Sequence, residues 1–348
     1  MKNLSFGKKV IFICNILFLV IWFISFFAPY INPENFSSVS FLAIAYPLIL
    51  IIHIFFILYW GIQFKKVIIY SIIAIISSYL FGTPIFKTKN KFKALAKDRS
   101  FSVMSFNSQM SYFLGGSKKQ VQENQSKIIH FINQENADIL CVQEARIGID
   151  TSLNYKYKSI FNFNHIYSKF QIIDAKEFIY KDASTNKSCY ADILVHKDTI
   201  RVYNLHLESL HLEKETFKII DELDSEDGER ILHNKTQRIS SKINSATKKR
   251  INQTMSIVSS IKNCPYPSMI CGDFNEVSQS YIYRKLTENY NDAFISSGKG
   301  FGATYRKFFF PLRIDYILVD KIWNPYNFEV LDEDISDHQA IRCDIEMN

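Results

Sequence analysis

The sequence predicts an α/β (α+β) protein with layered β-sheets under helices, preceded by a transmembrane helical region at the N-terminus. Three long apolar runs lie within the first 85 residues. From Phe101 onward, short apolar runs alternate with longer stretches of helical periodicity, which is typical of sheets covered by helices. Two apolar runs joined by a short polar turn, at residues 190–207, indicate a hairpin and therefore antiparallel pairing.

The three apolar runs cover residues 10–27, 39–60 and 67–81. The first two are long enough to span a hydrocarbon core of about 30 Å as helices, and the third is marginal. A cleaved signal peptide explains one such run and not three. We therefore expect residues 1–85 to form a membrane region with about three transmembrane helices, in preference to a buried soluble hairpin.

The net charge of +7 is unevenly distributed. Residues 1–100 carry 11 Lys and Arg against 2 acidic residues, a balance of +9, which leaves 30 against 32, a balance of −2, for residues 101–348. The basic excess thus flanks the membrane segments, where it can contact anionic lipid headgroups. Because a nucleic-acid enzyme more often has a basic domain surface, this distribution disfavours a nucleic-acid substrate.

The charges between the apolar runs bear on topology. Lys2, Lys8 and Lys9 precede the first run, and Lys65 and Lys66 follow the second, which places the N-terminus in the cytoplasm and the large domain outside. The six basic residues after the third run favour the opposite side, but long domains translocate largely regardless of charge. We expect an integral protein of a bacterial-type inner membrane, with its large domain on the extracytoplasmic side.

The first elements of the large domain follow a polar linker. Residues 86–100 form this linker, which is basic. The short apolar run 101–106 predicts a strand that ends at Asn107. Apolar residues recur at roughly helical spacing through 120–133, which predicts a helix, and residues 137–142 predict the second strand.

The middle of the domain is expected to contain a hairpin and a long helical region. Residues 168–172 predict a short strand, and residues 190–195 and 200–207 predict the two arms of the hairpin. Residues 211–262 are mostly polar and helical in character.

Two features of that helical region are interpreted as solvent-exposed. The acidic, glycine-containing stretch 222–229 is expected to be a solvated loop, and Lys248-Lys249-Arg250 a solvated helix face. Beyond the region, residues 281–289 predict a helix, and residues 313–319 and 339–345 predict the last strands.

The stretch Ser268-Met269-Ile270-Cys271-Gly272-Asp273-Phe274-Asn275 combines a buried strand with a polar end. Gly272 allows a sharp turn after the apolar run. Residues two apart on an extended chain point the same way, so Asp273 and Asn275 can address one ligand. Taken alone, an ordinary turn explains the stretch equally well, since Gly, Asp and Asn are the usual turn formers.

Other polar residues recur at the ends of strand-like runs. Single residues of this kind have ordinary explanations, such as a surface histidine or a strand-end cap. Asp315 is less ordinary, because a carboxylate inside an apolar strand needs a partner that offsets its desolvation. The residues that follow a run are Asn107, Glu144, His206, Asp273 and Asn275, and those that precede one are Asp337 and His338.

These motifs together resemble the endonuclease/exonuclease/phosphatase superfamily, which includes divalent-metal nucleases, sphingomyelinases, inositol-polyphosphate phosphatases and deadenylases. The resemblance implies a four-layer sandwich of two mixed β-sheets flanked by helices, and a catalytic domain at residues 101–348, with the membrane region outside it. The matching pieces, in the family's order, are Ser105-Phe106-Asn107, Val142-Gln143-Glu144, Asn204-Leu205-His206-Leu207, Gly272-Asp273-Phe274-Asn275, Arg313-Ile314-Asp315-Tyr316-Ile317 and Ser336-Asp337-His338.

The resemblance also implies a metal. Phosphodiesters resist attack because their anionic oxygens repel the nucleophile and the leaving oxygen departs as an alkoxide. A hard cation such as Mg²⁺, with Mn²⁺ as an alternative, neutralises both charges and prefers oxygen ligands. Glu144 is the implied ligand, with an amide oxygen from Asn107, and Asp337 completes or supports the site.

The remaining residues receive catalytic roles by resemblance. Asp273 orients or deprotonates the attacking water, and Asn275 and His206 donate hydrogen bonds to the phosphoryl oxygens. His338 is a base or a cationic stabiliser, and Asp315 accepts a hydrogen bond from its second ring nitrogen, which fixes the tautomer and raises the imidazole pKa. Asn204 matches a substrate-binding position and equally suits a structural role at a strand end.

We therefore expect a membrane-anchored, divalent-metal-dependent phosphoesterase that hydrolyses a phosphodiester by attack of water. Its expected partners are membrane lipid and a phosphate-ester substrate, namely a lipid head group, a nucleotide or a nucleic acid, and no protein partner is inferred. The alternatives are an endo- or exonuclease, and a catalytically idle membrane-bound binding protein of the same fold. The aromatic triplet 308–310 can dip into the bilayer or pack into the core, and the six cysteines indicate neither a disulfide framework nor a zinc site.

Overall fold

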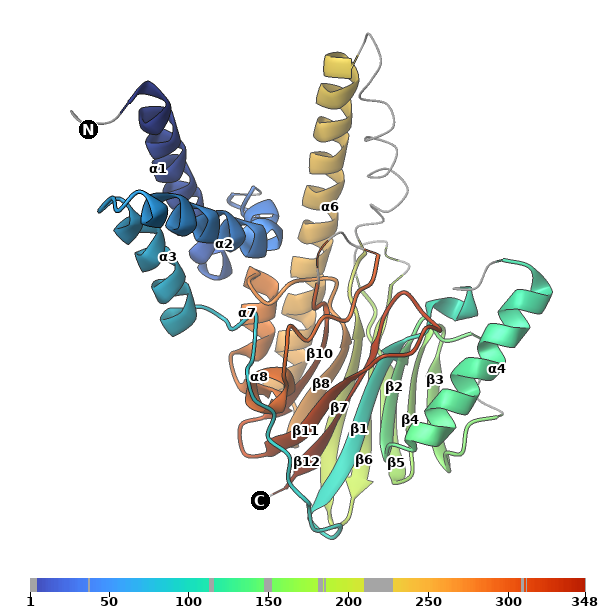
Figure 1. Ribbon diagram of the computed structural model, residues 1–348. Coiled ribbons are helices and arrows are strands. Elements are labelled where there is room, and N and C mark those ends of the chain that lie inside the picture. The colour runs from blue at the N-terminus through green and yellow to red at the C-terminus, as the bar shows by residue number, and fades with distance from the viewer. Residues whose placement is uncertain are drawn as a thin grey trace. The chain divides into compact units, whose positions relative to one another are not determined.

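The computed structural model describes most of the chain in two compact units. One unit contains residues 1–85 with 277–284, and the other contains residues 86–276 and 285–348. Figure 1 labels most of the helices and strands of both. The described residues are 5–36, 38–112, 116–146, 152–180, 184, 186–209, 228–307, 310 and 312–347.

The N-terminal unit contains a helix at each of the three predicted apolar runs. They are α1 (Phe6–Phe26), α2 (Val39–Ile62) and α3 (Ile68–Phe81), and a short 3-10 helix, η1 (Ala28–Tyr30), follows α1. The stretches Phe6–Tyr30 and Val39–Ile62 are long and apolar enough to cross a membrane, whereas α3 is shorter, with 14 residues. These helices are consistent with a transmembrane region.

Buried polar side chains connect these apolar helices. Asn15 Nδ2 on α1 donates to Ser71 Oγ on α3 at 2.9 Å, and Nδ1 of His53 on α2 lies 3.1 Å from the same Ser71 oxygen. Farther along, Trp22 Nε1 donates to Ser78 Oγ at 2.9 Å. In apolar surroundings such interhelical hydrogen bonds add to packing, so α3 is joined to both longer helices.

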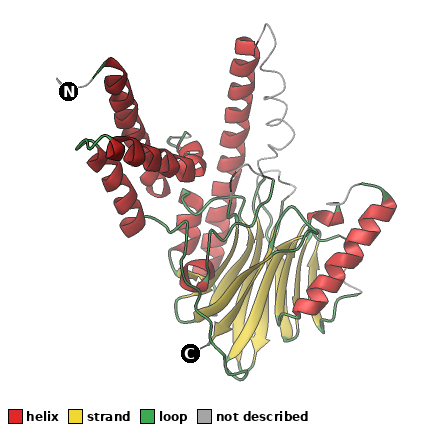
Figure 2. Ribbon diagram, viewed as in Figure 1, coloured by secondary structure: helices red, strands yellow, loops and turns green. Residues whose placement is uncertain are grey.

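The second unit is built on two six-stranded sheets, which Figure 2 shows in yellow. The first sheet has the order β11-β12-β1-β2-β4-β3 and the second has the order β5-β6-β7-β8-β10-β9. The strands are β1 (Ser100–Asn107), β2 (Ile139–Gln143), β3 (Tyr157–Phe161), β4 (Asn164–Ser168), β5 (Gln171–Glu177), β6 (Ser188–Val195), β7 (Asp198–His206), β8 (Ser268–Asp273), β9 (Tyr290–Asp292), β10 (Asp315–Asp320), β11 (Asn324–Leu331) and β12 (Ala340–Glu346).

The two sheets repeat one pattern of pairing. The central pair of each sheet is parallel, β1 with β2 and β7 with β8, and the other neighbours are antiparallel. Within each sheet, the carboxyl ends of the parallel pair therefore share an edge with the start of an antiparallel neighbour. That neighbour is β12 in the first sheet and β10 in the second.

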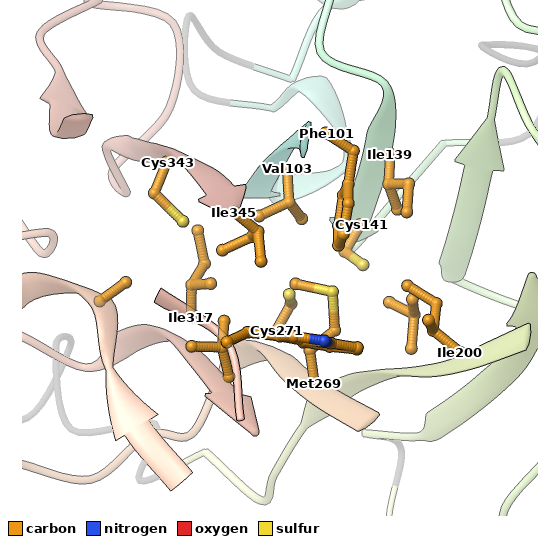
Figure 3. Packing of buried hydrophobic residues seen from close by; sticks show 14 of the residues in the cluster. Phe101, Val103, Ile139, Cys141, Ile200, Met269, Cys271, Ile317, Cys343 and Ile345 are labelled. Atoms are coloured by element: carbon orange, nitrogen blue, oxygen red, sulfur yellow. The ribbon is translucent and has the colours of Figure 1, made fainter. Parts of the chain in front are cut away.

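The core between the sheets follows from alternation along the strands. On β1, Phe101 and Val103 belong to the cluster between the sheets, and Met104 and Phe106 point to the opposite face. Figure 3 shows Val103 and Cys141 on one side of this cluster, with residues of the second sheet opposite them. The cysteines of this cluster are free thiols, not disulfides, and act as small buried hydrophobic side chains.

Helices cover the outer faces of the sheets. The first is α4 (Lys118–Glu135), which begins at a capping box formed by Ser117 and Gln120 and packs Ile128 and Ile132 against β1 and β2. Beside the second sheet lies α6 (Gly228–Lys262), whose Ser260 Oγ is 3.2 Å from the hydroxyl oxygen of Tyr203 on β7. Among the described residues, the other helices are η2 (Gln109–Ser111), α7 (Tyr281–Thr287) and α8 (Ala293–Ser297). The predicted fold class, two mixed sheets flanked by helices, is confirmed.

Some local predictions were wrong. The strand expected at residues 168–172 is a junction, because β4 ends at Ser168 and β5 begins at Gln171 in the other sheet. Its alternating pattern suits a strand, but the chain crosses between the sheets there. Arg250, expected on a solvated face, is 1% exposed, whereas Lys248 is exposed as predicted. Most of the acidic stretch 222–229, and Phe308 and Phe309 of the aromatic triplet, lie outside the described residues.

Candidate active site

The predicted site residues meet where strands of both sheets end or begin. Asn107 closes β1 and Asp273 closes β8, and Asn107 Nδ2 donates to Asp273 Oδ2 at 3.0 Å across the two sheets. The same nitrogen lies 3.4 Å from Oε1 of Glu144, which follows β2. The Nε2 atoms of His206 and His338 lie 3.8 and 3.7 Å from Asp273 Oδ2. Asp273 is therefore the central group of the site.

Gly272 determines how Asp273 reaches this position. Its φ angle is +134°, which side chains rarely permit, and an added Cβ would lie 2.0 Å from the backbone oxygen of Leu205. This close approach belongs to the parallel register in which Leu205 faces Gly272 and His206 faces Asp273. After the strand, Asn275 adopts φ +50° and its backbone N–H donates to Asp273 Oδ1 at 2.8 Å.

The electrostatics of Asp273 are set by burial and by neighbouring charges. Burial raises the pKa of its carboxyl, the charges of His338 and His206 lower it, and the charge of Asp315 raises it, with a net value of about 6. The Asp273 carboxyl therefore remains ionised at neutral pH but holds a proton far more readily than an exposed aspartate.

His338 has the opposite balance. Burial lowers the pKa of its imidazole, but the charges of Asp315 and Asp273 and a hydrogen bond to Asp315 outweigh burial and raise the pKa to about 10. The bond joins His338 Nδ1 to Asp315 Oδ2 at 3.0 Å. The other ring nitrogen, Nε2, is the one that faces Asp273, so a protonated His338 presents an N–H toward the centre of the site.

His206 is held by a residue that the sequence did not single out. Asn186 Nδ2 lies 3.0 Å from His206 Nε2 and also donates to the backbone oxygen of Leu207 at 2.7 Å. The same Leu207 oxygen accepts a hydrogen bond of 3.0 Å from Asn275 Nδ2. Asn186 stands between Thr185 and Lys187 in an ordinary polar stretch, and no apolar run precedes it, so the sequence carried no signal for it.

Two predicted residues make contacts that favour roles at the margin of the site. Asn204 is fully buried, its amide nitrogen donates to the backbone oxygens of Val142 and His165 at 3.0 and 2.9 Å, and its oxygen accepts from Gln143. Because both amide hydrogens are used, this geometry favours the structural role over a substrate contact. Asp337 is buried, and its Oδ2 lies 3.0 Å from Lys307 Nζ.

The donor set suits a hard divalent cation. Four carboxylates, those of Glu144, Asp273, Asp315 and Asp337, gather at the site, with His206, His338 and Lys307 beside them. Glu144 is 30% exposed at its side chain, so it can be reached from solvent. Asp273, Asp315 and His338 also place one ligand atom each within 4.8 Å of one another. A protonated imidazole cannot ligate a metal, so Glu144 with Asn107 fits the cation better.

Asn107 can act as a metal ligand only if its side-chain amide rotates. At present its nitrogen faces the carboxylates of Glu144 and Asp273, and its oxygen accepts from the backbone N–H of Gln109 at 3.1 Å. Rotation of the amide would present the oxygen to the carboxylate side, which is the orientation that a cation between these groups requires.

Comparison with known proteins gives two family matches. Residues 104–338 match the model of the Endonuclease/Exonuclease/phosphatase family, and residues 8–85 match a model described only as a domain of unknown function. No curated protein sequence matches the chain significantly.

Solved structures share the fold at low identity. An endonuclease/exonuclease/phosphatase family protein from Bacteroides thetaiotaomicron is 12% identical, with a TM-score of 0.51, covering 72% of this chain and 95% of that one. The mannosyl-6-phosphatase of the same organism is 12% identical, with a TM-score of 0.50 and coverages of 70% and 99%. A humanized D. rerio TDP2 is 13% identical, with a TM-score of 0.51 and coverages of 71% and 99%.

Proposed function

The chain belongs to the endonuclease/exonuclease/phosphatase family, and on that premise we propose that it is a membrane-anchored, divalent-metal-dependent phosphoesterase. The observation that carries the proposal is the position of Asp273. Its buried carboxylate lies within 4 Å of Asn107, His206 and His338, which come from three other strand ends. A water beside this carboxylate can be oriented by Asp273, an acceptor with a pKa of about 6. Protonated His338, 3.7 Å from the same carboxylate, places a positive charge at the site.

In this proposal Asp273 accepts a proton from the attacking water as the new phosphorus–oxygen bond forms. The bond from phosphorus to the ester oxygen breaks, and the alcohol leaves as an alkoxide that takes a proton from solvent. Asn275 and His206 donate hydrogen bonds to the phosphoryl oxygens. For this, Nε2 of His206 must carry a proton and leave its contact with the amide nitrogen of Asn186. The raised pKa of His338 favours the role of cationic stabiliser over that of base, and Asp315 keeps its ring oriented and charged. The equatorial oxygens thereby meet preorganised donors while charge develops.

When bound, a divalent cation, Mg²⁺ or Mn²⁺, would neutralise the negative charge on the phosphoryl and leaving oxygens. Glu144 and Asn107 are the residues that would hold it. Asp337 would support the site as part of the segment 336–338. This segment is fixed to β1 by Ser336, whose Oγ donates to the backbone oxygen of Asn107 at 2.7 Å.

The apolar helices α1 and α2 support a membrane anchor, with α3 as part of the same bundle. We place the catalytic domain on the extracytoplasmic side of a bacterial-type inner membrane, and a reporter fused after residue 348 tests this; reporter activity in the cytoplasm would overturn it. An anchored enzyme meets lipid continuously, so a lipid head group is the favoured phosphate ester, and soluble nucleotides are the next class to test.

A nuclease is the second candidate, because the description of the matching family includes endonucleases and exonucleases. The balance of −2 over residues 101–348 weighs against it, since nucleic-acid surfaces are usually basic. A catalytically idle binding protein is the third candidate, and it is disfavoured because the expected motif residues are all present.

The test uses the full chain purified in detergent micelles. Hydrolysis of a generic phosphodiester, bis(p-nitrophenyl) phosphate, is measured with Mg²⁺, with EDTA, and after Mg²⁺ is restored. We expect EDTA to abolish the activity and Mg²⁺ to restore it. We also expect the variants Asp273→Ala and His338→Ala to be inactive. Activity that survives chelation and both substitutions overturns the proposal, and a parallel panel of phospholipid, nucleotide and DNA substrates separates the three classes.

A further inference from the structure

A buried arginine on α6 touches the two segments that carry phosphate-facing residues. Arg250 Nε donates to Glu276 Oε1 at 2.7 Å, and Nη1 donates to the backbone oxygen of Glu208 at 2.8 Å. Its third contact, from Nη2, is to Thr247 Oγ1 on its own helix at 3.1 Å. Since Arg250 is 1% exposed and Glu276 is 6% exposed, this is a fully desolvated ion pair, which is costly to form and strongly disruptive to break.

A second residue of α6 completes the contact with Glu208. One turn after Arg250, Gln253 accepts a hydrogen bond from the backbone N–H of Glu208 at 2.9 Å. Arg250 and Gln253, which we call the α6 clamp, thus hold both backbone polar groups of one residue. That residue follows His206 by two positions, after the end of β7 and one residue beyond Leu207, whose backbone N–H still donates to the backbone oxygen of Asp273 at 3.1 Å.

The two segments held by the clamp also contact each other. Asn275 Nδ2 donates to the backbone oxygen of Leu207, which lies between His206 and Glu208. On the other side, Glu276 follows Asn275 directly, and the backbone oxygen of Glu276 accepts from the Tyr316 hydroxyl at 2.8 Å. Arg250 therefore bridges the end of β7 to the turn after β8, one residue beyond Asn275 and two beyond His206.

We infer that Arg250 is a positioning residue that sets the spacing between His206 and Asn275, with Gln253 supporting it. The inference rests on the proposed function, in which these two side chains donate to one phosphoryl group. A shift of about 1 Å between such donors costs on the order of 100-fold in rate, because both must reach the same group as charge develops. An arginine that only filled the core would lower the amount of folded protein without changing the geometry of the folded site.

The first test compares Arg250→Ala, Arg250→Lys and Gln253→Ala with Arg201→Ala. Arg201 is the matched control, because it makes a bidentate pair with Asp192 on β6, with contacts of 2.6 and 2.8 Å. For the folded fraction of full-length protein, we expect kcat to fall about 100-fold in Arg250→Ala, with a smaller change in KM. Gln253→Ala, which leaves no buried charge unpaired, should fall about tenfold, and Arg250→Lys should recover little because an ammonium cannot serve both segments.

A double-mutant comparison separates positioning from loss of folded protein. In an Asn275→Ala background, Arg250→Ala should cost much less than in the wild type, because one of the two donors it spaces is gone. An equal cost in both backgrounds, or an equal loss of kcat in Arg201→Ala, would overturn the inference.

Hydrogen exchange supplies a readout that does not depend on activity. Arg250→Ala should raise amide exchange in peptides covering residues 206–209 and 273–277, and Arg201→Ala should leave both unchanged. If the wild-type chain hydrolyses no phosphodiester, the proposed function fails while this exchange result still decides whether Arg250 fixes the two segments. Unchanged exchange at both segments in Arg250→Ala would overturn the inference whatever the activity.

Discussion

The hydrogen bond between His338 Nδ1 and Asp315 Oδ2, at 3.0 Å, joins the two sheets at the candidate site. His338 lies two residues before the start of β12 in the first sheet, and Asp315 begins β10 in the second. The pair thus depends on correct packing of both sheets. It also gives the imidazole an anionic neighbour that keeps it charged.

Replacing Asp315 by Asn should uncouple this pair. The pKa of His338 is raised chiefly by Asp315 against the effect of burial, so Asp315→Asn should lower that pKa from about 10. If protonated His338 stabilises the transition state, activity is lost as pH rises through its pKa, and the alkaline limb of the pH–rate profile should move to lower pH. We expect kcat/KM at pH 7 to fall about 100-fold. An alkaline limb that does not move would show that His338 does not act as a cation.

The acidic limb of the pH–rate profile should report the titration of Asp273. Its pKa of about 6 means that the carboxylate form, which accepts the proton, is present above that pH and is lost as pH falls through it. We expect kcat/KM to decrease about tenfold per unit below pH 6, since one proton blocks the base. The measurement is kcat/KM from pH 4.5 to 8 at saturating Mg²⁺. In Asp273→Asn, the residual rate should no longer decrease below pH 6. If it still decreases, the acidic limb of the pH–rate profile reports the titration of another group.

Gly272→Ala should damage the domain itself. An added Cβ at Gly272 would lie 2.0 Å from the backbone oxygen of Leu205 and would occupy a disfavoured φ, so β7 and β8 must separate locally. We expect a loss of unfolding free energy of about 3 kcal/mol or more, of the kind produced by strain at a special backbone conformation. Thermal unfolding of the full chain measures it. Gly116→Ala is the matched control, because nothing lies within 4 Å of its Cβ position.

Glu144→Gln should change the metal requirement. The substitution keeps the shape of the side chain and removes the carboxylate charge that a divalent cation prefers. We expect the Mg²⁺ concentration for half-maximal activity to rise by at least about tenfold, with part of the activity recovered at high Mg²⁺. A titration of rate against Mg²⁺ measures this. An unchanged half-maximal concentration would remove Glu144 from the set of metal-holding residues.

The sequence was informative about strand ends in particular. Asn107, Asp273 and His206 could be placed at one edge because each follows a short apolar run, and the runs form β1, β8 and β7 as expected. Their mutual distances came only from the structure, because residues 107 and 273 belong to different sheets and no local pattern records how two sheets pack.

Residues that act through the backbone were harder to predict. Asn186 contacts His206 from a polar stretch without periodicity, and Arg250 stands in a basic run that is typical of exposed helix faces. Burial of Arg250 depends on Glu276 and Glu208, which approach it only after α6 has packed on the second sheet. The strands β3, β4, β9 and β11 were also not predicted. β9 has only three residues, and β11 contains Pro325 and two asparagines, which are depleted in strands.

The pairing of β1 with β12 has a consequence for biogenesis. Ser100 lies opposite Glu346, so β1, one of the first soluble segments to be synthesised, finds its antiparallel neighbour among the last. The first sheet therefore cannot close while the ribosome is still adding β12, although α1 and α2 are available for membrane insertion long before. During that interval the edge of β1 that pairs with β12 is exposed. Until β12 has been synthesised, this edge is open to pairing with other chains.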